Sequence, residues 1–137
     1  MKEEVGDENI FIFGLKAEDV ALVREHGYDP MREIQQSPAL ARVLGMIEDG
    51  TFSADERGRY RPILDTLRTK DWFLVLKDFA SYVACQERVS QLWKDPEAWS
   101  RMSILNTAGM GKFSSDRCAL EYAQEIWKVV PTPITVT

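Results

Sequence analysis

Helix-start and helix-stop signals divide most of this chain into short amphipathic segments. Ser37-Pro38 combines an N-cap residue with a proline at the first helical position, and Asp95-Pro96-Glu97 repeats that arrangement. After the first signal, apolar residues recur at the i, i+3, i+4, i+7 spacing of one helix face: Leu40, Val43, Leu44 and Ile47. Gly50 follows where that helix is expected to stop. A chain divided in this way is expected to fold mainly as helices that bury their apolar faces.

Segments of this kind follow one another along the chain, and we expect about six to seven helices. Their approximate bounds are residues 16–26, 37–50, 55–67, 71–93, 95–109 and 114–127. Pro131 and Pro133 predict an extended tail. The sequence has no internal repeat, low-complexity segment or linker. We therefore expect residues 1–137 to form one piece with no internal boundary.

Residues 9–13 have a different pattern. Asn9-Ile10-Phe11-Ile12-Phe13 is short, nearly all apolar and followed by Gly14. This composition predicts a strand buried on both faces, as in a parallel sheet. No second strand is available in the sequence to pair with it. The expected fold class is therefore mainly α with one short N-terminal strand, and the missing partner indicates that the chain is part of a larger fold.

Composition argues against several kinds of partner. The chain has 17 Lys and Arg against 22 Asp and Glu, a net charge of −5, which argues against unspecific binding to nucleic acid. No apolar stretch approaches the roughly 18 residues of a membrane span. Met1-Lys2-Glu3-Glu4 is unlike the start of a secretory signal. We expect a cytoplasmic protein with neither a membrane nor a nucleic acid as partner.

Few residues in the sequence could ligate a metal or form a nucleophile–base pair. Cys85 and Cys118 are too few for a disulfide scaffold and have no CxxC spacing, so both are expected to be reduced and packed inside. His26, the only histidine, lies before Gly27 at an expected helix end, where a cation is mildly stabilising. We therefore expect no metal site.

Several segments resemble a known family in their order and spacing. Residues 8–15 read E-N-I-F-I-F-G-L, residues 78–89 read D-F-A-S-Y-V-A-C-Q-E-R-V, and residues 95–99 read D-P-E-A-W. Residues 104–108 read I-L-N-T-A, residues 111–117 read G-K-F-S-S-D-R, and residues 121–127 read E-Y-A-Q-E-I-W. Over roughly residues 8–131 the sequence resembles the α-glucan phosphorylases, which act on glycogen, starch or maltodextrin. Cys118 and Gly109-Met110 are small departures from the family pattern.

The resemblance implies that this chain is the C-terminal part of the Rossmann-like second domain of a GT-B glycosyltransferase. It implies a parent enzyme, expected to be a homodimer, that transfers glucose from an α-glucan to orthophosphate and releases glucose 1-phosphate. It also implies a pyridoxal phosphate cofactor, bound to a lysine in a G-N-M-K-F type motif upstream of the matched segment. Neither Lys2 nor Lys16 has such neighbours. We therefore expect no catalytic or cofactor-binding residue in this chain, whose partner would be the rest of the phosphorylase.

Two groups of residues invite a functional interpretation beside a structural one. Residues 113–117 could bind an anion at a capped helix start. We expect instead that Ser114 or Ser115 caps the helix while Asp116 and Arg117 pair with neighbours. The spacing of Asp65, Asp71 and Asp78 fits a solvated helix face better than the acid–base pair of a glycoside hydrolase.

Four aromatic residues form a third group: Trp72, Phe73, Trp93 and Trp99. They could stack on sugar rings, but at helical spacing aromatic side chains are more often part of a core. Trp72 stays open to either interpretation, because it follows Lys70-Asp71 at a helix junction.

Two functions remain in competition. In the first, the chain is the structural C-terminal portion of a phosphorylase and is inactive by itself. In the second, it is a non-catalytic helical binding or scaffold module derived from that domain.

Overall fold

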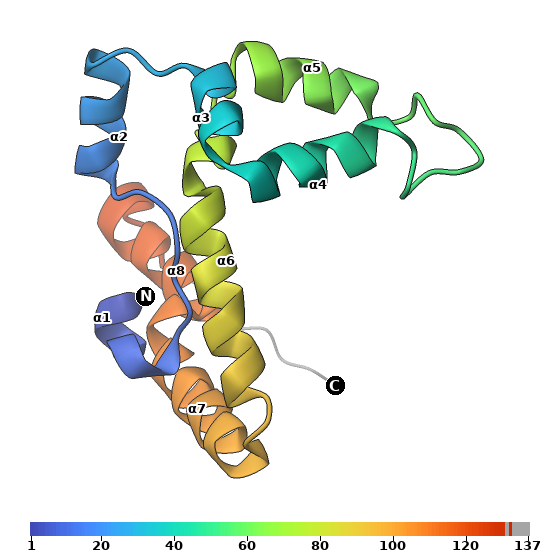
Figure 1. Cartoon of the computed structure of the whole chain (residues 1–137). Helices are drawn as coiled ribbons and strands as arrows, with labels where there is room; N and C mark the ends of the chain where they lie inside the picture. Colours follow the sequence, from blue (N-terminus) through green and yellow to red (C-terminus); the bar gives the residue numbers. More distant parts are fainter. Residues whose placement is uncertain (131, 133–137) are drawn as a thin grey trace. The chain divides into compact units, whose positions relative to one another are not determined.

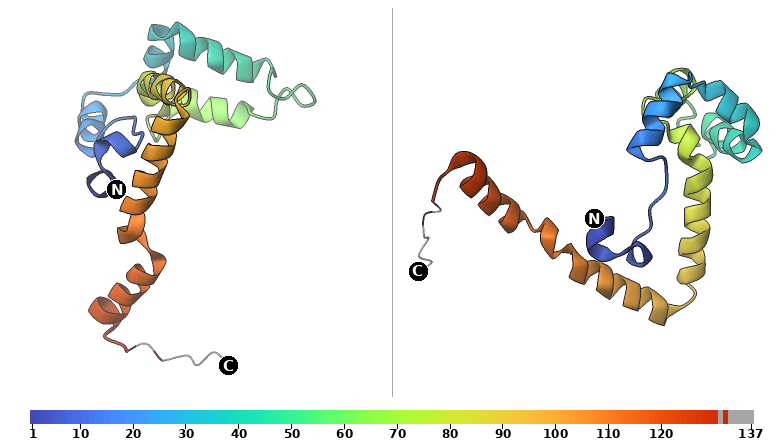
Figure 2. Two further views of the ribbon diagram at one scale, coloured as in Figure 1. Left: turned by 90° about the horizontal axis from the view of Figure 1, so that it is seen from below. Right: turned by 90° about the vertical axis from the view of Figure 1, so that its left-hand side faces the viewer.

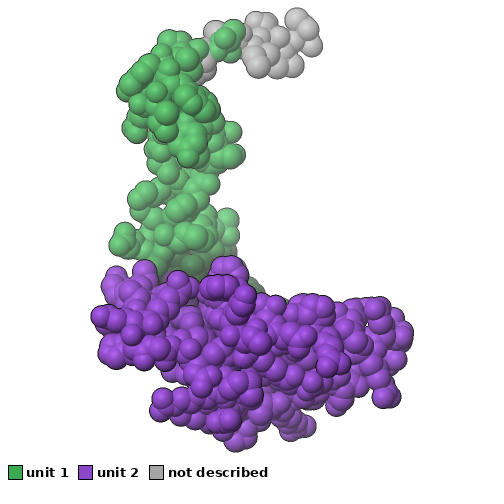
Figure 3. Space-filling model, turned by 90° about the horizontal axis from the view of Figure 1, so that it is seen from above, with its two compact units in different colours: residues 1–11, 89–137 green, residues 12–88 purple. Residues whose placement is uncertain are grey.

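The computed structural model describes residues 1–130 and residue 132 (Figure 1). The tail expected at Pro131 and Pro133 lies outside the described residues. The chain divides into two compact units, which are coloured separately in Figure 3. Unit 1 comprises Met1–Phe11 and Val89–Thr137, and unit 2 comprises Ile12–Arg88. The expectation of one piece without an internal boundary stays a prediction.

Unit 2 is built from α2 (Ala17–Glu25), α3 (Pro30–Gln36), α4 (Pro38–Glu48), α5 (Arg61–Thr69) and most of α6 (Val75–Leu92). Caps define two of the helix starts. Asp29 Oδ1 accepts the Met31 N–H at 2.9 Å before α3, and Ser37 Oγ accepts the Leu40 N–H at 3.3 Å before α4. In both helices a proline occupies the first helical position, where its missing N–H costs nothing.

The core of unit 2 lies between α4, α5 and the start of α6. It consists of Leu40, Leu44, Leu64 and Leu76, with Ile34, Ile47, Leu67 and Phe79 packed around them. Helices α4 and α5 run side by side in every view (Figure 2). Arg68 donates two hydrogen bonds from α5 to Glu48 of α4, at 2.9 and 2.7 Å. These bonds hold the pKa of the Glu48 carboxyl below its usual range.

Unit 1 contains α1 (Lys2–Val5), the 3-10 turn η1 (Asp7–Asn9), α7 (Pro96–Gly109), the 3-10 turn η2 (Met110–Phe113), α8 (Ser115–Glu121) and the π-helical turn η3 (Tyr122–Trp127). Asp95 caps α7 by accepting the Ala98 N–H at 3.0 Å. The buried Asn9 links both ends of the unit. Its Nδ2 donates to the Val5 carbonyl at 2.8 Å, and its own carbonyl accepts from Asn106 Nδ2 at 2.8 Å.

The strand predicted at residues 9–13 is absent, and the described part of the chain contains no β-strand at all. Asn9 ends a 3-10 turn, and the four residues after it are irregular although Ile10 has extended dihedral angles (φ −146°, ψ 141°). A strand needs a neighbouring strand to take up its backbone hydrogen bonds. Phe13 instead packs edge-on against the Tyr82 ring, with centroids 5.1 Å apart.

The fold class is therefore all-helical over the described residues, and the prediction of a strand-bearing part of a Rossmann-like domain is wrong. The helix predictions fare better, but α5 begins at Arg61 instead of near residue 55, and α3 was not expected. None of the helices in the described residues is both long and apolar enough to cross a membrane.

Candidate functional site

Unit 2 has a surface cavity of about 310 Å³ where the end of α2, the start of α3 and the first turn of α6 meet. Its wall includes His26, the only histidine, together with Tyr28, Arg32, Glu33 and Lys77. Both signs of charge and a phenol are therefore gathered at one surface. Such a cavity is the natural place to look for a binding or catalytic group.

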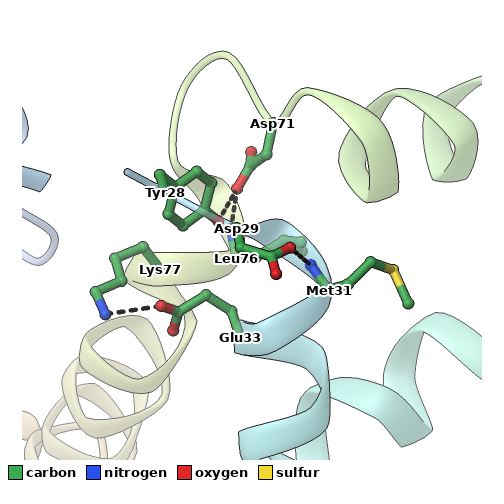
Figure 4. Close-up of polar contacts among 7 residues, drawn as sticks. All are labelled: Tyr28, Asp29, Met31, Glu33, Asp71, Leu76 and Lys77. Atoms are coloured by element: carbon green, nitrogen blue, oxygen red, sulfur yellow. Dashed lines mark hydrogen bonds and ion pairs between the residues drawn. The ribbon is translucent and has the colours of Figure 1, made fainter. Parts of the chain in front are cut away.

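The strongest polar contacts beside this cavity converge on Asp71, which is only 2% exposed (Figure 4). Tyr28 donates its hydroxyl proton to Asp71 Oδ2 at 2.6 Å. The N–H groups of Val75 and Leu76 donate to Oδ1 at 2.9 Å and to Oδ2 at 3.0 Å. Asp71 thus satisfies two orphan donors at the start of α6, where a negative charge is favoured by the helix dipole.

Burial and the hydrogen bond to Asp71 raise the pKa of the Tyr28 phenol above its ordinary value. Removing the Tyr28 proton would place a second negative charge beside Asp71 in a partly desolvated site. The phenol is therefore held in its protonated form and donates a hydrogen bond. It is not poised as a base near neutral pH.

Lys77, Glu33 and His26 of the cavity wall are also engaged in structural contacts. Lys77 Nζ of α6 pairs with Glu33 Oε1 of α3 at 2.8 Å (Figure 4). His26 caps the end of α2, where its Nδ1 donates to the Leu22 carbonyl at 2.7 Å, as the helix-end prediction required. Among the described residues, no group of three His, Cys, Asp or Glu side chains could hold a metal ion.

The three aspartates considered as a possible acid–base set have different surroundings. Asp65 is exposed, as a solvated helix face requires. Asp78 is half-buried and accepts the Leu15 N–H at 2.9 Å. Asp71 is buried in the loop before α6, so the expectation of a solvated position is wrong for this residue. The spacing could not reveal this, because Asp71 lies outside the helices.

Residues 113–117 follow the structural interpretation only at Arg117. Arg117 Nε donates to the Lys112 carbonyl at 2.5 Å, and its guanidinium forms an ion pair with Glu121. Ser114 occupies the N-cap position of α8, but its side chain makes no capping hydrogen bond, so the expected serine cap is wrong there. The Arg117 guanidinium is thus engaged within the chain, as the structural interpretation expects for this residue.

Three of the four aromatic residues are exposed, and Trp99 is partly buried. Trp72 is 61% exposed, Phe73 85% and Trp93 65%. The rings of Trp93 and Trp99 meet edge to face with centroids 4.8 Å apart. The core prediction is therefore wrong for Phe73 and Trp93, and the reservation about Trp72 is confirmed.

Both cysteines are free, as predicted, but only Cys85 is buried and Cys118 is exposed. The most important residue that sequence reasoning missed is Tyr28. It follows a glycine and precedes the Asp29 cap of α3, and nothing in its spacing marks it as a partner of Asp71, 43 residues away.

Comparison with known proteins gives a consistent result. The carbohydrate phosphorylase family model matches residues 1–129. The chain is 44% identical over 134 residues to the glycogen phosphorylase of Synechocystis sp. and 42% identical over 137 residues to the liver form of Homo sapiens. It is 44% identical over 132 residues to the muscle form of Ovis aries.

These alignments cover 98%, 100% and 96% of this chain, respectively, but the chain spans only 16% of the length of each relative. The match of the family model over nearly every residue and the identities above 40% agree with the motifs at residues 78–89 and 111–127. On these grounds the chain belongs to the carbohydrate phosphorylase family.

Proposed function

We propose that this chain is the C-terminal portion of a pyridoxal-phosphate-dependent α-glucan phosphorylase and that its role there is structural. The observation that carries the proposal is the match of the carbohydrate phosphorylase family model over residues 1–129. The relatives are named glycogen phosphorylase, and the chain spans 16% of their length. The parent reaction would be transfer of glucose from an α-glucan to orthophosphate, with release of glucose 1-phosphate. The parent would be a cytoplasmic homodimer, and the remainder of its chain would be the partner of this segment.

The contacts of unit 2 support a structural role. Asp71, the most buried charged side chain, binds the start of α6 and the phenol of Tyr28. The Glu33–Lys77 pair links α3 to α6, and the Glu48–Arg68 pair links α4 to α5. Each of these polar groups fixes one helix against another, and none combines a nucleophile with a base.

The paired lysines of this chain do not fit a pyridoxal phosphate site. Lys77 is paired with Glu33, Lys112 with Glu4, and the exposed Lys2 with Asp7. A lysine that forms a Schiff base needs its amine free, and a low pKa is the usual means. These three lysines are therefore poor candidates for the Schiff base, and we expect the isolated chain to bind no coenzyme and to release no glucose 1-phosphate from glycogen.

Complementation tests the proposal. The Synechocystis relative would be truncated before its matching segment and incubated with this chain, glycogen and orthophosphate. Glucose 1-phosphate release would then be measured for each protein alone and for the mixture. We expect no release by the chain, little by the truncated relative, and restored release by the mixture.

Two variants make the result specific to the folded chain. Asp71→Ala removes the cap of α6. The glucose 1-phosphate release that this variant restores should fall to the same extent as its folded fraction, which circular dichroism measures. Asp65→Ala, an exposed change on α5, should restore activity like the native chain. Release by the isolated chain, or coenzyme absorbance that survives dialysis, would contradict its inactivity. A folded chain that restores nothing would contradict the structural role and favour a separate scaffold module.

A further inference from the structure

The loop before α6, residues 70–74, has an unusual backbone. Asp71 and Leu74 have φ values of 33° and 55°, in the left-handed region that residues other than glycine seldom adopt. Both of these side chains are buried, at 2% and 3% exposed. Strained conformations of this kind persist only where the surroundings enforce them, and they are concentrated at functional sites.

Four hydrogen bonds enforce this conformation. The Leu74 N–H donates to the Asp71 carbonyl at 2.9 Å and closes the turn. The Asp71 carboxylate accepts the first N–H groups of α6. Arg24 of α2 donates from Nη2 to the Trp72 carbonyl at 2.8 Å, so the middle of the loop is also held. The loop is therefore ordered before any ligand arrives, which lowers the entropic cost of binding.

The two side chains that this rigid loop presents are Trp72 and Phe73, which are 61% and 85% exposed. Burial of these two rings would be favourable. The buried side chains of Asp71 and Leu74, one on each side of the pair, nevertheless hold the loop so that both rings face solvent. Lys70 Nζ lies 5.4 Å from the centroid of the Trp72 ring. The site therefore combines aromatic surface with N–H donors on Lys70 and Arg24.

This combination suits a sugar chain. The C–H face of a pyranose packs on an aromatic ring, while its hydroxyl oxygens accept hydrogen bonds from ammonium or guanidinium groups beside the ring. An extended polysaccharide needs only a small rigid platform for each contact.

We propose that Trp72 and Phe73 form a surface binding site for an α-glucan chain, with Lys70 and Arg24 as hydrogen-bond donors at its edge. The choice of an α-glucan rests on the proposed function, whereas the presence of a carbohydrate site rests on the loop. The site holds the polysaccharide and performs no chemistry.

Native gel electrophoresis of this chain with and without glycogen in the gel tests the proposal. Glycogen should retard the native chain, and added maltoheptaose should reverse the retardation while a β-linked glucan oligosaccharide should not. Trp72→Ala and Phe73→Ala should each weaken the apparent affinity about tenfold or more, because truncating a central aromatic anchor removes most of such a contact. Trp93→Ala is the matched control, since Trp93 is similarly exposed (65%) in unit 1 and should leave the affinity unchanged.

Circular dichroism should show that the variants remain folded, because both rings are exposed. No retardation of the native chain, equal retardation of Trp72→Ala, or equal loss in Trp93→Ala would overturn the site. If the substitutions change self-association on light scattering and leave glycogen binding unaltered, the surface docks protein and the proposal is wrong. Trp72→Ala would also be tested in the complementation assay. If this variant restores phosphorylase activity although it no longer binds glycogen, the proposed function stands independently of the binding site.

Discussion

At the scale of single residues, the carboxylate of Asp71 has the greatest structural effect. It accepts three hydrogen bonds, one from Tyr28 and two from the backbone at the start of α6. A buried carboxylate is tolerated only when its oxygens are satisfied, and its removal leaves buried donors without partners. The cost of losing Asp71 should therefore exceed that of losing an ordinary exposed cap.

Asp71→Ala should lower the free energy of unfolding by about 2–4 kcal/mol, the combined loss of a cap and of buried hydrogen bonds. Urea denaturation followed by circular dichroism measures the change. Asp65→Ala on the exposed face of α5 should stay within about 0.5 kcal/mol of the native chain. Equal effects of the two substitutions would show that the Asp71 bonds contribute nothing.

Tyr28 makes stability depend on pH in the alkaline range. The folded-state pKa of its phenol lies above the unfolded value of 10.0, so folding favours the protonated form. Its contribution to stability is complete below pH 10 and should decline as the pH rises further. Tyr28→Phe should therefore be less stable than the native chain at pH 8 by about 1 kcal/mol, with the difference shrinking above pH 10. Urea denaturation at both pH values measures this, and a constant difference would argue against the raised pKa.

Single residues were predictable where the signal is local. The His26 helix end could be predicted from its immediate neighbours, because the following glycine and proline mark a stop. The burial of Asp71 could not, because its phenol partner lies 43 residues away. The exposed Phe73 was expected in a core because spacing alone does not show that this residue lies in a turn before α6 and not in the helix.

At the scale of elements, capping chemistry explains which helices were predicted well. Ser37 and Asp95 both cap helices whose first residue is proline, as expected. Asp29-Pro30 has the same signature and starts α3, but a proline three residues after Gly27 also fits the stop of the preceding helix. A proline shortly after a glycine can follow the end of one helix or begin the next, and only tertiary packing determines which of the two occurs. The strand was wrong for a related reason, because an apolar run implies burial without specifying a hydrogen-bonding partner.

Two helical glycines provide an opposed pair of predictions at this scale. A Cβ at Gly45 in α4 would meet nothing within 4 Å, whereas one at Gly109 in α7 would lie 2.9 Å from the Glu4 carbonyl and the Val5 Cα. Gly45→Ala should stabilise the chain by about 0.5–1 kcal/mol through helix propensity. Gly109→Ala should instead destabilise unit 1 by about 1–3 kcal/mol, because backbone atoms of α1 must move.

Thermal unfolding of both variants would be compared with that of the native chain. The prediction concerns the sign of each change, because the two substitutions are chemically identical and differ only in what surrounds them. Stabilisation by both would mean that α1 does not pack against α7 in solution.

At the scale of the whole molecule, the buried apolar residues are unevenly distributed. Leu40, Leu44, Leu64, Leu74, Leu76 and Cys85 lie in unit 2, whereas Val5 and Ala123 are the buried apolar residues of the described part of unit 1. Hydrophobic burial is the largest favourable contribution to folding. The two units should therefore differ in stability, with unit 2 the more stable.

Hydrogen exchange measured by mass spectrometry at increasing urea concentrations tests this difference. Peptides from α4, α5 and the first half of α6 should become exchangeable at higher urea than peptides from α7 and α8. Leu64→Ala, at a position only 2% exposed, should lower the unfolding free energy of unit 2 by about 2–5 kcal/mol. Exchange in α7 should then stay as in the native chain, because that helix draws little stability from the leucine core. If every peptide shifts together in both proteins, the chain unfolds as one cooperative unit, and the uneven burial does not translate into separate stabilities.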